Sequence, residues 1–197
     1  MSSRAARWVG LVLAAIFGCA SDGIDVHEYV LTSKVAADPS PAIAGALTLA
    51  VGPVVVPAYL RRREIVTRVG DNEMRASDTH RWAEDLGHGL ARVVAEDLGT
   101  LVPGLRVSAF AWRDMGATDY RVAIEVERFE PMPDGTVALE AHWELLRANQ
   151  PSPVAAHSST LSENASGSGT TAAVDAMSRA AARLSQEIAQ SLPSDPR

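Results

Sequence analysis

The sequence has a single cysteine, Cys19, and a single lysine, Lys34, in 197 residues. A lone cysteine cannot form a disulfide within the chain, so an internal disulfide framework is excluded. The formal net charge is -6, which argues against nucleic acid as a partner because nucleic-acid-binding proteins normally carry a basic face. Nearly all basic residues are arginine, which we interpret as a bias of genomic composition. The hydrophobic fraction of 47% is ordinary for a globular protein, and the length fits one domain with a sizeable core.

Motifs of common catalytic and cofactor sites are also missing. The sequence contains no G-x-x-x-x-G-K-[ST] loop, no H-E-x-x-H pair and no G-x-S-x-G elbow. Residues 167–172 match G-x-G-x-x-A, but the acidic residue that would follow, Glu187, falls inside the last expected helix. We interpret this stretch as a loop with Thr170 or Thr171 as the helix N-cap. The sequence therefore predicts no enzyme activity, no metal and no cofactor.

The N-terminus has the pattern of an export signal. Arg4 and Arg7 precede an apolar run over residues 8–17, and Gly18 follows. Ten apolar residues form about 15 Å of helix, half of the roughly 30 Å hydrocarbon core of a bilayer. The run therefore predicts a secretory signal and not a transmembrane span.

Cys19 follows directly on Ile16, Phe17 and Gly18, and it resembles the acceptor cysteine of a bacterial lipobox. The resemblance implies a signal peptide over 1–18, lipidation with palmitate-type acyl chains at Cys19 and an acylated tether over 19–25. Two or three acyl chains hold a protein on a bilayer, since each buried CH2 contributes about 0.8 kcal/mol. No aspartate follows the cysteine, which by resemblance to Gram-negative lipoproteins implies the outer membrane. The alternative is a buried free thiol.

Period-two alternation and turn residues predict several strands. Phe129 falls out of phase with the strand that contains it, which predicts a bulge near Arg128. Residues 70–72 are expected to turn a hairpin. The expected strands cover 25–32, 46–51, 63–69, 73–77, 105–112, 119–129, 136–146 and, more weakly, 153–162.

Two helices are expected, one starting at Ser77 or Asp78 and ending near Leu101, and one over about 171–191. In the first helix Gly87 and Gly89 each cost about 1 kcal/mol relative to alanine, so we expect a close packing contact there. His80 and His88 would lie on this helix about 12 Å apart, too far to share a metal.

The order of elements predicts an α+β fold: a single-domain sandwich, with a largely antiparallel sheet and two amphipathic helices packed on one face. The domain is expected over 26–192, with a disordered tail at 193–197.

The segment GPVVVPAYLRRREIVTR, residues 52–68, stands out in composition. Pro53 and Pro57 lack the N–H that a central strand needs, so the segment is expected at an edge or a bend. Such a bend would leave Tyr59 and Leu60 near the surface beside arginines, and tyrosine and arginine are enriched in interface hot spots. The alternative is that Tyr59 and Leu60 fold back to cap the core beside solvated arginines. The residues expected to dock a partner are Pro53, Pro57, Tyr59, Leu60 and Arg62.

Five segments in chain order resemble the ABC-type transport auxiliary lipoproteins, the PqiC family. They are 51–68, 81–98, 119–130, 137–145 and the alanine-rich last helix. The most specific marks are the Pro-x-x-x-Pro-x-Tyr-Leu pattern over 53–60 and Arg-Trp-Ala-Glu at 81–84. The resemblance extends over about 26–192.

The resemblance implies a non-catalytic lipoprotein that is anchored in the outer membrane and faces the periplasm of a Gram-negative bacterium. Its role would be that of an accessory docking subunit of an MCE-type ABC transport system, which moves lipids or hydrophobic molecules and supports membrane integrity. The implied partners are an MCE-domain protein and, in a homo-oligomeric ring, further copies of the chain. Two alternatives stay open: a periplasmic carrier with lipid between sheet and helices, and an enzyme or activator of cell-wall synthesis on a similar fold.

Overall fold

The structure is a computed structural model that describes residues 24–36, 47–109, 118–148 and 150–193. No helix within these ranges is long and apolar enough to cross a membrane. The elements in chain order are β1 (His27–Tyr29), β2 (Thr48–Val55), the 3-10 helix η1 (Ala58–Leu60), β3 (Glu64–Arg68), β4 (Met74–Trp82), α1 (Leu86–Leu101), β5 (Arg106–Ala109), β6 (Tyr120–Pro131), β7 (Thr136–Arg147), β8 (Pro153–Asn164) and α2 (Thr170–Gln190).

The described strands form two sheets, where the sequence predicted one. The larger sheet has the order β5-β2-β6-β7-β8, and the smaller has the order β1-β4-β3. The long ladders β6–β7 and β7–β8 are antiparallel, whereas β2 runs parallel to β5 and to β6. The largely antiparallel character is thus confirmed. The second sheet arises because the chain leaves the larger sheet after β2, and β3 pairs with β4 instead of with β6.

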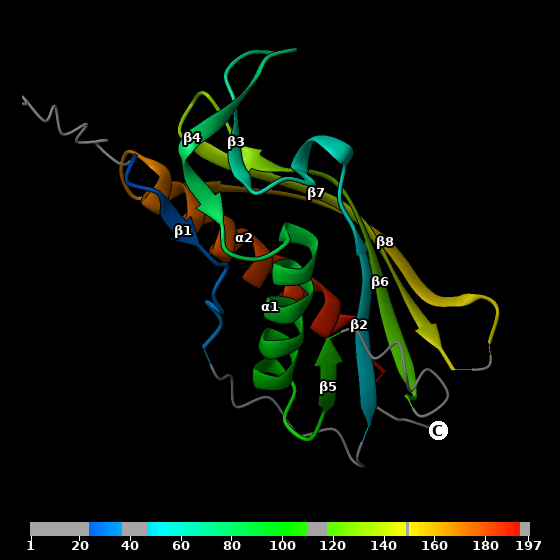
Figure 1. Cartoon of the computed structure of the whole chain (residues 1–197). Coiled ribbons are helices and arrows are strands. Elements are labelled where there is room, and N and C mark those ends of the chain that lie inside the picture. The colour runs from blue at the N-terminus through cyan, green and yellow to red at the C-terminus, as the bar shows by residue number, and fades with distance from the viewer. Residues whose placement is uncertain (1–23, 37–46, 110–117, 149, 194–197) are drawn as a thin grey trace, which may run out of the picture.

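Both helices cover the same face of the five-stranded sheet (Figure 1). α1 packs against β2 and β5, α2 packs against β7 and β8, and the helices contact each other. The inward residues of β6 and β7 alternate as predicted, and Val122, Leu139 and Leu145 are fully buried beneath the helices. The α+β sandwich with two helices on one face is therefore confirmed. The three-stranded sheet lies beyond the N-terminal end of α1 (Figure 1).

The predicted start of the first helix is wrong. Ser77 and Asp78 lie inside β4, and α1 begins at Leu86 with Asp85 as its N-cap, whose carboxylate accepts a hydrogen bond from the His88 amide at 3.0 Å. β4 extends to Trp82 because it pairs with β1 on one side and with β3 on the other. Trp82 fits the apolar spacing of the helix, but its side chain enters the core from the end of a strand. His80 consequently belongs to β4, and the expectation of His80 and His88 on one helix is wrong.

The close contact expected at the helix glycines is confirmed. A Cβ on Gly87 would lie 3.1 Å from the carbonyl oxygen of Val54, and a Cβ on Gly89 would lie 3.1 Å from Oε1 of Glu84. A backbone oxygen cannot move aside easily, so Gly87 lets the first turn of α1 approach β2 closely. This approach fixes α1 beside the end of the strand that leads into Pro57.

Other local expectations have mixed outcomes. The bulge near Arg128 is confirmed, because the β6–β7 register shifts between Val126 and Arg128. The N-cap of α2 is Gly169, with a φ of 90° and no side-chain cap, so the expected threonine cap is wrong. β1 is shorter than expected, and β8 is a full strand of 12 residues. β5 ends at Ala109, and the rest of the strand expected there lies outside the described residues.

Asp97 is a buried carboxylate at the contact between the helices. Its side chain is 0% exposed; Oδ2 accepts a hydrogen bond from Ser185 at 2.9 Å, and Oδ1 has no hydrogen-bond partner in the described part of the chain. Burial raises the pKa of Asp97, and the interactions with Ser33 and Ser185 offset only part of this effect. The folded state therefore favours the protonated form of this group.

This environment predicts a pH dependence of stability. The folded pKa of Asp97 lies above the unfolded value, so its favourable contribution is complete below the unfolded pKa and is lost as pH rises through the folded pKa. Asp97→Asn, which cannot ionise, is expected to melt at a higher temperature than the wild type at pH 8, with the difference shrinking toward pH 4. Thermal unfolding at several pH values tests this, with Glu144→Gln on the exposed face of β7 as control. A difference that does not vary with pH would contradict it.

Candidate functional site

The stretch over residues 53–63, called here the 53–63 segment, leaves the larger sheet at a bend. β2 lies between β5 and β6 at Thr48–Val51, and its register with β6 shifts between Val51 and Val54. Among the described residues β5 pairs only as far as Val51, so the strand has one paired neighbour at Pro53. The bend predicted from the prolines is thus present within β2, and the chain then turns through η1 into the smaller sheet.

The residues expected to dock a partner differ in how far they are exposed in the structure. Leu60 is 4% exposed and belongs to the core, so its expected position near the surface is wrong. The cause is η1, which turns the chain back so that the Leu60 amide donates to the Pro57 carbonyl at 3.0 Å. Pro57 and Tyr59 are half-buried, and Pro53 is exposed.

The arginines beside this turn are exposed. Arg62 donates to Glu64 at 3.0 Å, and Arg63 donates to Glu28 of β1. Arg61 has no ion pair or hydrogen bond from its side chain within the described ranges. A surface therefore remains open to contact. It consists of Val55, which is 52% exposed, the exposed Pro53, the half-buried Pro57 and these arginines.

Tyr59 is held in place by a buried carboxylate, Glu130 of β6. Its hydroxyl donates to Oε2 of Glu130 at 2.8 Å. Arg68 of β3 donates to Oε1 of the same carboxylate from Nε at 3.0 Å and from Nη2 at 2.9 Å. Arg128 lies 3.6 Å from Oε1 and also donates to Glu140 at 3.0 Å. We call Tyr59, Arg68, Arg128 and Glu130 the Glu130 cluster.

The Glu130 cluster joins the two sheets. Glu130 is 0% exposed, and Oε2 also accepts a hydrogen bond from the Phe129 amide at 3.0 Å. The carboxylate thus has several donors, as a buried charge requires. Burial, together with the bond to Glu130, raises the pKa of Tyr59 to about 12, so its hydroxyl keeps its proton at neutral pH. The bond to Glu130 raises the pKa of Arg68. The cluster therefore fixes the path of the 53–63 segment.

Tyr59→Phe removes the hydroxyl that donates to Glu130. We expect the free energy of unfolding to fall by about 1–2 kcal/mol, because one hydrogen bond to a charged acceptor is lost while the ring remains. Chemical denaturation of the wild type and of the variant measures the change. Arg61→Ala, two residues away and exposed, is the control and should change stability by less than about 0.5 kcal/mol. Equal effects of the two variants would contradict the role assigned to the hydroxyl.

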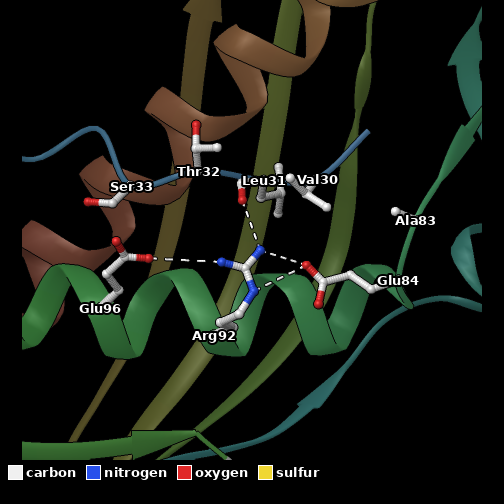
Figure 2. A pocket seen from close by; sticks show the side chains of 8 residues that line it. All are labelled: Val30, Leu31, Thr32, Ser33, Ala83, Glu84, Arg92 and Glu96. Carbon is white, nitrogen blue, oxygen red and sulfur yellow. Dashed lines mark hydrogen bonds and ion pairs between the residues drawn. The ribbon is translucent and has the colours of Figure 1, made fainter. Parts of the chain in front are cut away.

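A hollow of about 550 Å³ lies beside α1. Figure 2 shows Arg92 between Glu84, Glu96 and the carbonyl of Leu31. Arg92 donates to Glu84 at 2.6 Å and to Leu31 at 2.9 Å, and Glu96 lies 3.9 Å away. The charge of Arg92 is thus balanced by neighbouring acidic side chains, and its bond to the Leu31 carbonyl holds the chain after β1 against α1. This arrangement is that of a structural tie and does not suit an anionic ligand.

A row of polar side chains on the open face of the larger sheet has the residue types of a hydrolase triad. His142 contacts Ser158 through Nδ1 at 2.7 Å and Glu127 through Nε2 at 2.9 Å. All three side chains are exposed on adjacent strands. The register of β6, β7 and β8 brings them together as cross-strand neighbours. Because the three side chains are exposed on a flat sheet face, they are best described as a solvated polar row and not as a catalytic site.

The comparisons with known proteins agree with this fold. The model of the family described as the ABC-type transport auxiliary lipoprotein component matches residues 29–189. A crystal structure of an uncharacterized protein is 22% identical, with a TM-score of 0.70, covering 84% of this chain and 97% of its own. A DUF330 protein from Xanthomonas campestris is 22% identical, with a TM-score of 0.68, covering 83% of this chain and 93% of its own. No curated protein matches the chain.

The two solved structures share the fold over nearly their whole length. The family model extends over both sheets and both helices, from Tyr29 of β1 to Ala189 of α2, and includes the 53–63 segment and the Glu130 cluster. The chain belongs to the family of ABC-type transport auxiliary lipoprotein components.

Proposed function

We propose that this protein is a non-catalytic docking subunit of an MCE-type ABC transport system. Lipid at Cys19 anchors it in the outer membrane, and its domain faces the periplasm. There it binds the MCE-domain protein through which lipids or other hydrophobic molecules cross the envelope, and so it supports membrane integrity. ATP hydrolysis belongs to another subunit, and several copies of the chain form a ring around the path of the cargo.

The observation that carries the proposal is the family match, which includes the 53–63 segment within residues 29–189. An auxiliary component of a transporter needs a rigid surface for its partner more than it needs a reactive group. The Glu130 cluster supplies this rigidity, because it holds Tyr59 and the end of β3 against β6. The exposed Val55, Arg61 and Arg62 then lie on a fixed support. Pro53, Pro57 and Tyr59 shape this surface, and Leu60 acts from the core beneath it.

A role as lipid carrier has less support. The space between the larger sheet and the helices is filled by side chains such as Phe129, Leu90 and Leu184, which are 0% exposed. The hollow beside α1 has apolar lining residues such as Val30 and Leu31, but it is also lined by Glu84, Arg92 and Glu96, and acyl chains there would cover these charges unfavourably.

The test is purification of the full-length chain from detergent extracts of its own envelope, with bound proteins identified by mass spectrometry. The proposal expects an MCE-domain protein in a reproducible ratio to the chain. A variant that changes Arg61 and Arg62 to glutamate should retain less of that protein. Arg75→Glu, on the exposed side of β4, is the control for a single charge reversal away from this surface and should retain as much as the wild type. Recovery of the wild-type chain without any MCE-domain protein would contradict the proposal.

A further inference from the structure

The open edge of the larger sheet at β8 is the feature that the proposed function leaves unused. β8 pairs with β7 on one side and is the last strand of its sheet. A strand at a sheet edge presents unpaired N–H and C=O groups that can pair with another chain, and natural proteins usually protect such edges. At 12 residues, β8 is a long edge for a protein of this size.

Backbone hydrogen bonds show which residues of β8 face outward. The Ala165 amide donates to the Gly135 carbonyl at 3.0 Å, directly beside the opposed residues Thr136 and Asn164. In an antiparallel ladder this pattern makes Thr136 and Asn164 a pair without mutual hydrogen bonds, so the backbone groups of Asn164 point away from β7. Because this orientation repeats every second residue, the backbone groups of Ala156, Ser158 and Thr160 also point away from β7.

One end of this edge is closed by the last helix. Arg179 of α2 donates to the Asn164 carbonyl, and Arg183 donates to the Ser162 carbonyl at 3.3 Å. Both arginines are also paired with Glu163. Further along the strand no such cover is present: no side chain or loop of the described residues bonds to the outward backbone groups of Ala156, Ser158 and Thr160.

The open part of the edge also lacks the charges that usually block pairing. From Gln150 to Ser162 the sequence has no lysine, arginine, aspartate or glutamate. The other edge strands differ: β1 has 3 residues, β5 has 4, and β3, with 5, carries Glu64 and Arg68. Lysines and other charges on an edge are a common protection against strand addition. The open, uncharged edge is thus confined to one place.

We infer that β8 is the site at which an extended, uncharged segment of the MCE-domain partner adds as a sixth strand to the larger sheet. The inference rests on the proposed function for the identity of the partner. Main-chain bonds to Ala156, Ser158 and Thr160 supply the binding, and side chains of small size on β8 permit close approach. The added strand of the partner ends where Arg179 and Arg183 close the edge.

A second copy of the chain fits this edge less well. Two β8 strands paired antiparallel about Ser158 would bring their Ser159 residues close together on the helix side. Glu187 of α2 is hydrogen-bonded to Ser159, so the carboxylates of the two copies would meet near the two-fold axis. Like charges at this separation disfavour the pairing. A different chain without an acidic residue at this place avoids the repulsion.

Ser158→Pro tests the inference in the full-length chain. Proline removes the outward N–H and adds a ring to the edge, and edge strands tolerate proline when the missing N–H faces outward. Ser158→Ala is the matched control, because it also loses the bond to His142 but keeps the amide. We expect recovery of the MCE-domain protein to fall about tenfold or more with Ser158→Pro, the loss that one or two hydrogen bonds of about 1 kcal/mol and the steric block produce. Ser158→Ala should match the wild type.

The outcomes separate the two ideas. If the wild type and both variants retain the MCE-domain protein equally, the strand-addition site is wrong and the proposed function stands. If the wild type retains none, the proposed function fails, and strand addition by this partner fails with it. Thermal unfolding checks that Ser158→Pro is folded. If this variant is not folded, Thr160→Lys replaces it in the test. A lysine on the edge blocks strand pairing but leaves every backbone amide intact. Hydrogen exchange of residues 156–160 should slow in the complex, and unchanged exchange there would also overturn the inference.

Discussion

Replacing Glu130 with alanine is expected to destabilise the domain by about 3–5 kcal/mol, the effect of removing one partner of a buried charge cluster. The carboxylate is 0% exposed and receives hydrogen bonds from Tyr59, Arg68 and the Phe129 amide. Without it Arg68, whose side chain is 17% exposed, loses its counter-charge in a largely desolvated place. Thermal unfolding should show a decrease of roughly 10 °C in Tm, given about 2–4 °C per kcal/mol for a domain of this size.

Glu140→Ala is the matched control for this result. Glu140 pairs with Arg128 at 3.0 Å, but its side chain is 31% exposed. A partly exposed ion pair contributes about 0–1 kcal/mol, so this variant should unfold near the wild-type temperature. If Glu130→Ala also loses less than about 1 kcal/mol, the Glu130 cluster does not hold the two sheets together. The support that it gives to the 53–63 segment would then have to come from elsewhere.

The second large effect is expected from Cys19→Ala. Two or three acyl chains bind a bilayer strongly, whereas a protein without them has only the weak attraction of its surface. The variant should move almost completely from the membrane fraction to the soluble periplasm. Fractionation of cells, with immunodetection of the chain in each fraction, measures the change.

Ser21→Ala, which keeps the cysteine, is the control and should remain with the membranes. Metabolic labelling with a radioactive fatty acid should mark the wild type and this control, and should not mark Cys19→Ala. A Cys19→Ala chain that stays with the membranes would contradict the lipid anchor. The folded domain of such a variant should unfold at the same temperature as the wild type, because Cys19 lies before the domain.

The elements predicted correctly are those in which one buried face gives the sequence a regular spacing of apolar residues. β6 and β7 alternate between the core and the open face, and Val122, Ile124, Trp143 and Leu145 are buried as the period-two alternation of these strands predicts. The bulge near Arg128 was visible for the same reason, since one extra residue moves Phe129 out of phase. α2 was recognisable from the spacing of its apolar residues.

The parts predicted poorly depend on pairing between distant segments. β4 contains Ser77 and Asp78, which are typical of helix starts, and only its contacts with β1 and β3 make it a strand. Leu60 is buried because η1 turns back, and neither neighbour of Leu60 in the sequence specifies this. Tertiary contacts override such local preferences.

The Glu130 cluster was missed for a related reason. Glu130 follows Glu125 and Glu127, two glutamates on the same strand that face solvent, and nothing in its local pattern marks it as buried. Its partners Tyr59 and Arg68 are distant in sequence, at separations of 71 and 62 residues. The one available signal was the bulge before it, because a bulge redirects the side chains that follow.

The central claim, that the protein is a docking subunit, is tested most directly by binding between purified components. The lipidated full-length chain is immobilised in a supported bilayer, and the periplasmic part of the MCE-domain protein is titrated over it while bound mass is recorded. We expect saturable binding that weakens at least about tenfold with Ser158→Pro or with the Arg61 and Arg62 charge reversal, each change corresponding to roughly 1.4 kcal/mol or more. Binding that never rises above that of a bilayer without the chain would rule out the docking role.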